Sequence, residues 1–113
     1  DAESYMGCAV VFSDSVPAEL SVVVPQAAND LLTINGVEAS FVAVDNGAQV
    51  SVSARSMGDV NVQVIMEKLG GGGHLTMAGA QLRNVSLEEA KRRLLDAISE
   101  YRESQRTEKQ KNS

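Results

Sequence analysis

Two alternating runs around a short turn constrain the fold more than any other feature of the sequence. In "ASFVAVDNGAQVSVSAR", residues 39–44 and 49–55 alternate between apolar and small or polar side chains. Between them lies Asp45-Asn46-Gly47, and Asn-Gly is a favoured sequence for tight hairpin turns. The pattern therefore predicts an antiparallel pair of strands with one buried face.

The segment before this hairpin combines a strand pattern with a helix pattern. The apolar run at residues 5–12 predicts one buried strand. After it, Leu31 and Leu32 stand at helical spacing from two alanines, and Asn35-Gly36 is a helix stop. Proline is tolerated only in the first turn of a straight helix, so the helix either begins near Val24 or is kinked at Pro25.

The segment after the hairpin predicts two further helices with an extended segment between them. Apolar residues recur at helical spacing over residues 60–69, where Asp59 or Asn61 would cap the start. Residues 75–82 fit a strand, and a surface helix follows from a capping box at Ser86 and Glu89. We expect an α/β class, with a mixed β-sheet flanked by helices in a single domain over residues 1–105, and a disordered tail at 106–113.

The composition excludes several classes of function. Residues 1–86 hold three basic and nine acidic side chains, a net charge of -6, which disfavours a broad nucleic-acid surface. One histidine and one cysteine cannot form a catalytic transition-metal centre, so no metal ligand and no catalytic residue is predicted. Cys8, inside an apolar run, is expected to be a buried small side chain.

Four consecutive glycines, residues 70–73, precede the single histidine, His74. One glycine is enough to end a helix, so three remain to be explained. Glycine-rich turns can form a concave nest of amides that binds anions. Because this loop follows a helix, further positive potential would come from His74 and from Arg55 at the end of the hairpin. Taken alone, His74 and Arg55 would each be ordinary exposed side chains.

A longer stretch resembles a known family. "VSARSMGDVNVQVIMEKLGGGGHLTMAGAQL" is similar to the carboxy-terminal substrate-binding domain of DHH-family phosphoesterases, the DHH-associated domain. Upstream, "AANDLLTINGVEASFV" resembles the membrane-anchored cyclic-di-AMP phosphodiesterases of the GdpP type. The resemblance covers about residues 27–98. Pro25 and Met77 depart from the family pattern, and Met77 would narrow the pocket or change the base that it accepts.

The resemblance implies a fragment of a phosphodiesterase that cleaves cyclic-di-AMP to linear pApA. A DHH domain of the same protein would hold Mn²⁺ and cleave the bond, whereas this fragment would bind no metal and be inactive alone. Its substrate-binding residues would be Arg55, Ser56, Gly71, Gly72, Gly73 and His74. Further expectations are a cyclic dinucleotide or short oligonucleotide as ligand, a homodimer, and a cytoplasmic location within a membrane-anchored bacterial protein.

Three alternatives stay open at this point. The same domain type occurs in single-strand exonucleases and nano-oligonucleotide phosphatases of the DHH family, and a related domain forms the RNA-binding carboxy-terminus of alanyl-tRNA synthetases. The net charge of residues 1–86 disfavours long strands and RNA. In the third alternative, the glycine loop is only a packing or dimerisation element.

Overall fold

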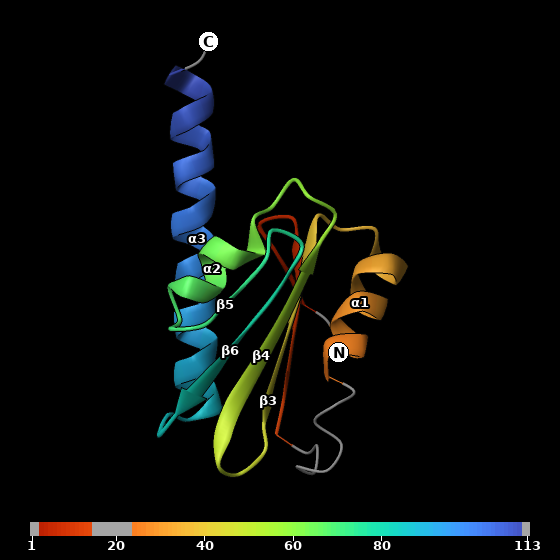
Figure 1. Cartoon of the computed structure of the whole chain (residues 1–113), viewed down its shortest axis with the longest axis vertical. Coiled ribbons are helices and arrows are strands. Elements are labelled where there is room, and N and C mark those ends of the chain that lie inside the picture. Colours follow the sequence, from red (N-terminus) through yellow and green to blue (C-terminus); the bar gives the residue numbers. More distant parts are fainter. Residues whose placement is uncertain (1–2, 15–23, 112–113) are drawn as a thin grey trace.

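The computed structural model describes residues 3–14 and 24–111 of the chain, which form one six-stranded sheet with helices on both faces (Figure 1). The strands lie in the order β1-β2-β3-β4-β6-β5. β2 and β3 are parallel, and every other neighbouring pair is antiparallel. The predicted α/β class with a mixed sheet is confirmed. In chain order the elements are β1 (Glu3–Tyr5), β2 (Cys8–Ser13), α1 (Val24–Asn35), β3 (Ala39–Asp45), β4 (Gln49–Ser56), α2 (Val62–Glu67), β5 (Gly72–Gly73), β6 (Met77–Arg83) and α3 (Leu87–Lys111).

The predicted hairpin is confirmed as β3 and β4, which pair from Ala39–Ser56 to Asp45–Val50. Asn46 closes its turn, because its side chain accepts from the amides of Ala48 and Gln49. The single strand expected over residues 5–12 is wrong. Met6 and Gly7 both have positive φ, 51° and 82°, and two such residues in succession make the tight turn that separates β1 from β2.

The helix boundaries follow local capping. α1 begins at Val24, so Pro25 lies in its first turn, as in the first of the two alternatives. Asn61 caps α2 by accepting from the amides of Gln63 and Val64. At the start of α3, the Ser86 hydroxyl accepts from the Glu89 amide at 3.0 Å, whereas the Glu89 carboxylate binds Arg92 and Arg93 rather than closing the capping box.

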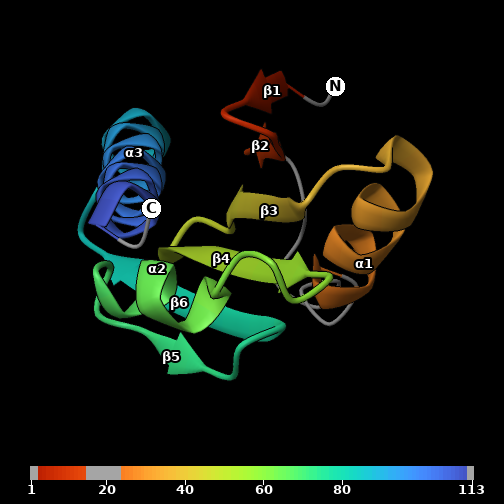
Figure 2. The same ribbon diagram turned by 90° about the horizontal axis from the view of Figure 1, so that it is seen from above.

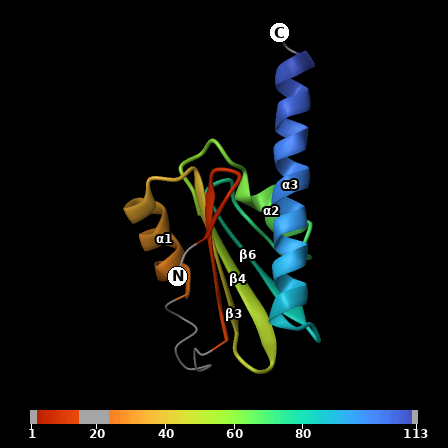
Figure 3. The same cartoon turned by 180° about the vertical axis from the view of Figure 1, so that it is seen from behind.

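The carboxy-terminal helix continues past the boundary that the sequence suggested at residue 105. α3 is helical without a break from Leu87 to Lys111, and residues 112–113 lie outside the described part. Figure 3 shows that this helix runs along the sheet and then extends well beyond it. The assignment of residues 106–113 to a separate tail stays a prediction.

The helices cover the two faces of the sheet unequally, as seen from above (Figure 2). α2 and α3 lie on one face and bury the larger core cluster, which includes Phe41, Val52 and Leu94. α1 lies on the opposite face, where Ala28 packs against Val42 and Val44 of β3. Among the described elements, α1 covers the part of this face formed by β2, β3 and β4, and no described helix lies mainly over β6 and β5 there.

Candidate anion-binding site

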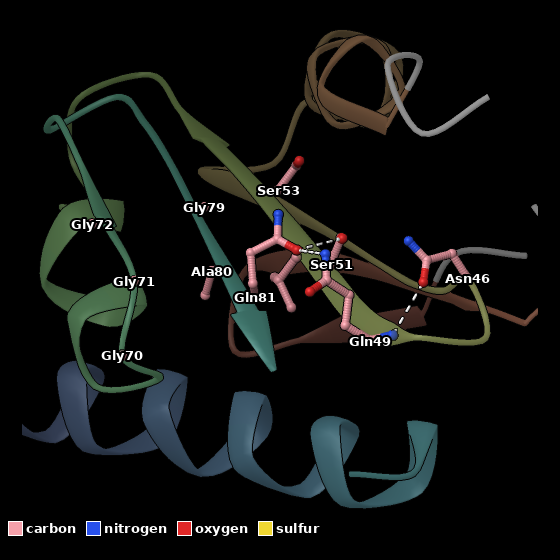
Figure 4. Close-up of a pocket in the computed structure, with 11 residues that line it drawn as sticks. Asn46, Gln49, Ser51, Ser53, Gly70, Gly71, Gly72, Gly79, Ala80 and Gln81 are labelled. Carbon is pink, nitrogen blue, oxygen red and sulfur yellow. Dashed lines mark hydrogen bonds between the residues drawn. The ribbon is translucent and has the colours of Figure 1, made fainter. Parts of the chain in front are cut away.

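The uncovered part of the sheet forms a shallow hollow of about 480 Å³ (Figure 4). Side chains alternate between the two faces of a strand, and in β4 the residues at even positions, from Val50 to Ser56, are the buried ones. The odd positions of β4 and β6, together with Gly72 and His74, therefore share the other surface, which we call the open face. The hollow itself is lined by Asn46, Gln49, Ser51, Val52, Ser53, Gly70, Gly71, Gly72, Gly79, Ala80 and Gln81.

At three of the four glycines, the backbone conformation or a close contact within the protein requires the absence of a side chain. Gly70 has φ +84°, and the amides of Gly70 and Gly71 donate to the carbonyls of Glu67 and Met66, the bond pattern of a Schellman cap. A Cβ at Gly71 would lie 2.1 Å from the carbonyl oxygen of Gly79. Gly73 has φ +149°, and its Cβ would lie 2.5 Å from Ala78 Cα. These positions explain why glycine is needed without any ligand.

Gly72 is the exception. It has no left-handed φ, and a Cβ there would meet nothing within 4 Å. Gly72 pairs with Gly79, which pairs with Ser53, so the three residues lie in one row across β5, β6 and β4 on the open face. The absence of side chains at Gly72 and Gly79 makes a flat floor in the hollow. Internal packing does not require Gly72, whereas close approach of a ligand would.

The glycines do not form the concave nest of amides that the sequence suggested. The Gly70 and Gly71 amides are already bonded within the protein, and Gly72–Gly73 is an extended strand paired with β6. His74 and Met77 donate backbone hydrogen bonds to each other. In an antiparallel ladder the neighbouring pair, which contains Gly73, is then not hydrogen-bonded, and its two amides point away from each other. The loop therefore offers a smooth surface rather than a cluster of donors.

Arg55 and His74 lie on the same face with Met77 between them. Arg55 is the register partner of Met77, and Met77 bonds to His74 in the next position across the sheet. Neighbouring strands are about 4.8 Å apart, so the Arg55 and His74 backbones are about 10 Å apart. Arg55 is half-buried, His74 is exposed, and Met77 is 50% exposed. This row borders the glycine floor but does not line the hollow itself.

Ser56 is separated from the other predicted site residues. Its side chain is on the buried face with 7% exposure. The hydroxyl donates to the Leu75 carbonyl and accepts from the Gly58 amide. Its position holds the β5–β6 turn against the end of β4, and the Ser56 amide adds a bond to the Thr76 carbonyl.

The charge pattern distinguishes the open face from the rest of the described chain. Among the arginine and lysine side chains that the structure describes, only Arg55 and Arg83 lack a carboxylate partner within 4.0 Å. Both lie on the open face, Arg83 beside Gln49 at the end away from Arg55. None of the open-face positions on β4, β5 and β6 is acidic. A chain of net charge -5 thus has two unpaired guanidinium groups on one acid-free surface.

Sequence reasoning missed the polar lining of the hollow. The hollow is lined by Ser51, Ser53, Gln49 and Gln81, which lie at alternate positions of β4 and β6 on the face that α1 covers only in part. The alternation of β4 carried this signal, since its polar positions share one face. This alternation alone could not reveal the hollow, because the sequence does not show how many strands α1 covers.

The described residues contain no group of three or more His, Cys, Asp or Glu side chains placed to hold a metal ion. The polar side chains on the open face are two guanidinium groups, amides, hydroxyls and the single imidazole of His74, and they include none of the carboxylates that Mn²⁺ prefers. Within the described part of the chain, no helix combines the length and apolar character that a bilayer span requires.

The chain matches relatives over most of its length. The cyclic-di-AMP phosphodiesterase GdpP of Geobacillus thermodenitrificans is 52% identical over 96 residues, which cover 84% of this chain and 15% of that protein. The cyclic-di-AMP phosphodiesterase PdeA of Listeria monocytogenes is 50% identical over 72% of this chain and 12% of its own length. The bifunctional oligoribonuclease and PAP phosphatase NrnA of Thermus thermophilus is 44% identical over 59% of this chain and 22% of its own length. The chain thus spans less than a quarter of each relative.

Solved structures with low sequence identity share the fold. An exopolyphosphatase-related protein of Bacteroides fragilis superposes with a TM-score of 0.75 at 20% identity, over 89% of this chain and 32% of that one. The C-Ala domain of Aquifex aeolicus alanyl-tRNA synthetase gives a TM-score of 0.60 at 19% identity, over 88% of this chain and 98% of that domain. The DHHA1 domain profile matches residues 17–104, and on this evidence the chain belongs to the DHHA1 domain family.

Proposed function

We propose that the open face binds the phosphate and nucleotide portion of cyclic-di-AMP or a short linear oligonucleotide, as the substrate-binding part of a phosphodiesterase. The observation that carries this proposal is the pairing of two unpartnered arginines with a glycine floor on one acid-free surface. Relatives named as cyclic-di-AMP phosphodiesterases and an oligoribonuclease support the ligand class.

Arg55 is the main phosphate contact in this proposal. A guanidinium can donate two parallel hydrogen bonds to phosphate oxygens, and such charge-assisted bonds are stronger than neutral ones. Because no carboxylate neutralises Arg55, no ion pair has to be broken before a phosphate binds. Its half-buried position also limits screening by solvent.

His74 and the glycines complete the proposed contact. The exposed His74 ring can donate a hydrogen bond across Met77 to the same nucleotide. Gly71, Gly72 and Gly73 let the ligand approach the backbone, with Gly72 the position where an added side chain would enter the hollow. Ser56 acts through the β5–β6 turn, which it holds in place. The hollow of about 480 Å³ is within the usual range for small-ligand sites.

The chemistry of cleavage is proposed for another domain. A DHH domain of the same protein would hold Mn²⁺ and hydrolyse the phosphodiester to pApA, while this chain orients the substrate and offsets its charge. A membrane anchor, a cytoplasmic location and a homodimer belong to the same proposal for the whole protein. The isolated chain should bind nucleotide without hydrolysing it.

Titration of the chain with cyclic-di-AMP and with pApA, followed by NMR amide shifts, tests the proposal. The amides of Gly72, Gly79 and Ser53 should shift, and Arg55→Ala should weaken binding by about 1.5–3 kcal/mol, the contribution of a hydrogen bond to a charged group. Arg106→Ala is the matched control, since Arg106 is paired with Glu103 on α3.

Two outcomes would contradict the proposal. The first is shifts confined to residues outside the open face. The second is equal affinity of Arg55→Ala and Arg106→Ala. Tighter binding of long single strands or of tRNA than of dinucleotides would favour the exonuclease or RNA-binding alternatives. A strong salt dependence should accompany that result, because long strands release more counterions.

A further inference from the structure

The two unpaired arginines of the open face stand at opposite ends of the hollow. Arg55 is the register partner of Met77, whereas Arg83 is the register partner of Gln49, six residues from Arg55 along β4. Six residues of a strand measure about 20 Å at 3.3 Å per residue. Side chains stand roughly perpendicular to a sheet, so the two positive charges lie far apart on one surface.

The surface between the two arginines is polar and uncharged. None of the open-face positions of β4, β5 and β6 between them is an acid or a base. Two rows of residues cross this surface, one of Ser53, Gly79 and Gly72 and one of Ser51 and Gln81 (Figure 4). Successive rows are two residues apart along each strand, about 6.7 Å. A chain of phosphates laid along the strands would therefore meet no carboxylate between its ends.

We infer that the open face binds a linear oligonucleotide of about four nucleotides, with Arg83 as a second phosphate subsite. Neighbouring phosphates of a strand are about 3.4 Å apart along a stacked helix and about twice as far, about 7 Å, in an extended strand. Four phosphates of an extended strand thus span about 20 Å, the distance from Arg55 to Arg83. The inference rests on the proposed function, because it assumes that a nucleotide phosphate binds Arg55.

A dinucleotide is too short to contact both arginines. One ribose joins the two phosphates of pApA, and each ribose of cyclic-di-AMP likewise joins its two phosphates, so neither ligand separates them by more than about 7 Å. Either ligand can bind Arg55, and Arg83 then attracts it only at long range. A strand longer than four nucleotides gains no further contact of this kind, because the described part of the open face has no third unpaired arginine or lysine.

The test compares pApA with pApApApA in NMR titrations of the chain at about 0.15 M salt, where long-range attraction is screened. We expect the tetranucleotide to bind about tenfold more tightly, the effect of one added hydrogen-bonded contact to a charged group. Arg83→Ala should abolish this gain. Arg106→Ala is the matched control and should keep the gain, since it removes the same charge from α3, where Arg106 is paired with Glu103.

Salt dependence gives a second measurement. Each phosphate of a single strand that a cation neutralises releases counterions and adds about 0.7 to the slope of log affinity against log salt. The slope for pApApApA should therefore be steeper than the slope for pApA by about 0.7, and Arg83→Ala should remove this difference.

Three outcomes would overturn the inference. They are equal affinity of the two ligands for the unmodified chain, an undiminished gain in Arg83→Ala, and a steady rise in affinity beyond four nucleotides, which would favour the exonuclease alternative. In each case the proposed function stands if pApA still shifts the Gly72 and Gly79 amides and Arg55→Ala still weakens its binding. If neither ligand shifts those amides, the proposed function itself fails, and this inference fails with it.

Discussion

The two faces of strand β4 have the same backbone and opposite roles. On one face Val50, Val52 and Ala54 are at most 2% exposed and pack into the core that α2 and α3 cover. On the other face Gln49, Ser51 and Ser53 line the hollow. A period of two residues thus separates buried apolar side chains from the polar lining of the hollow within eight residues, and substitutions on the two faces should affect different measurements.

The two faces of β4 differ because the helices on each side of the sheet cover different sets of strands. α2 contacts β6 and β5, and α3 contacts β2 and β3, so one face is covered across the sheet. On the other face, α1 contacts β2, β3 and β4 and makes at most slight contact with β6 and β5. Tyr101 of α3 accepts a hydrogen bond from the Asn61 amide at 2.8 Å and so fixes the start of α2, which in turn sets the position of the glycine run.

The largest expected effect is on the covered face. Phe41→Ala removes a fully buried ring from the larger core cluster and should lower the free energy of unfolding by about 3–5 kcal/mol. Urea denaturation followed by circular dichroism measures it. Ser53→Ala on the open face is the control and should stay within about 0.5 kcal/mol. Similar losses for both variants would break the comparison between the faces.

Gly71 and Gly72 should respond differently although they are neighbours. Gly71→Ala forces a methyl group against the Gly79 backbone and should cost about 1–3 kcal/mol in the free energy of unfolding. Gly72→Ala should change stability by less than about 0.5 kcal/mol but weaken dinucleotide binding, because its Cβ enters the hollow. Denaturation and titration of both variants measure this. Full binding by Gly72→Ala would show that the floor is not used.

Arg83 allows the two unpaired arginines of the open face to be compared with each other. It is exposed and lies about 7 Å beyond Gln81 along β6, so we expect it to act on the ligand through charge alone. Arg83→Ala should weaken dinucleotide binding by about 0.5–1 kcal/mol at low salt, and this loss should shrink at high salt. Calorimetry at two ionic strengths measures it. A loss larger than that of Arg55→Ala would reverse the assignment of the main phosphate contact.

The smallest expected effect lies on the solvent side of α3. Hydrogen bonds from Arg92 and then Arg93 lower the pKa of Glu89 from 4.5 to about 2. A lowered carboxylate pKa stabilises the fold above pH 4.5, and this stabilisation is lost as the pH falls toward 2. Glu89→Gln should therefore be slightly less stable than the unmodified chain at pH 7 and equal to it near pH 2. An equal difference at both pH values would contradict this.

The sequence predicted the parts of the fold that local chemistry determines. The hairpin turn was predicted outright, whereas the Asn61 cap and the first-turn position of Pro25 were each one of two alternatives that the sequence left open. The break between β1 and β2 was missed because Met6, with φ 51°, is not a residue type that favours this conformation.

The candidate site was only partly predictable. The glycine run and the lone histidine stand out in the sequence and drew attention to Gly71, Gly72, Gly73, His74 and Arg55, whose role in binding stays a prediction. Gln49, Gln81 and Arg83 could not be found, because their meeting depends on the register between β4 and β6, which are separated by α2. The lack of a carboxylate near Arg55 is likewise a property of the folded surface.

The borders of the sheet are its shortest strands, with three residues in β1 and two in β5. An unpaired strand edge is a template on which another polypeptide can add itself, and natural sheets protect such edges by keeping them short. Glycine also pairs poorly as an isolated strand, since it loses more backbone freedom than other residues when it is ordered. The two-glycine strand that borders the hollow therefore also offers other polypeptides little edge on which to pair.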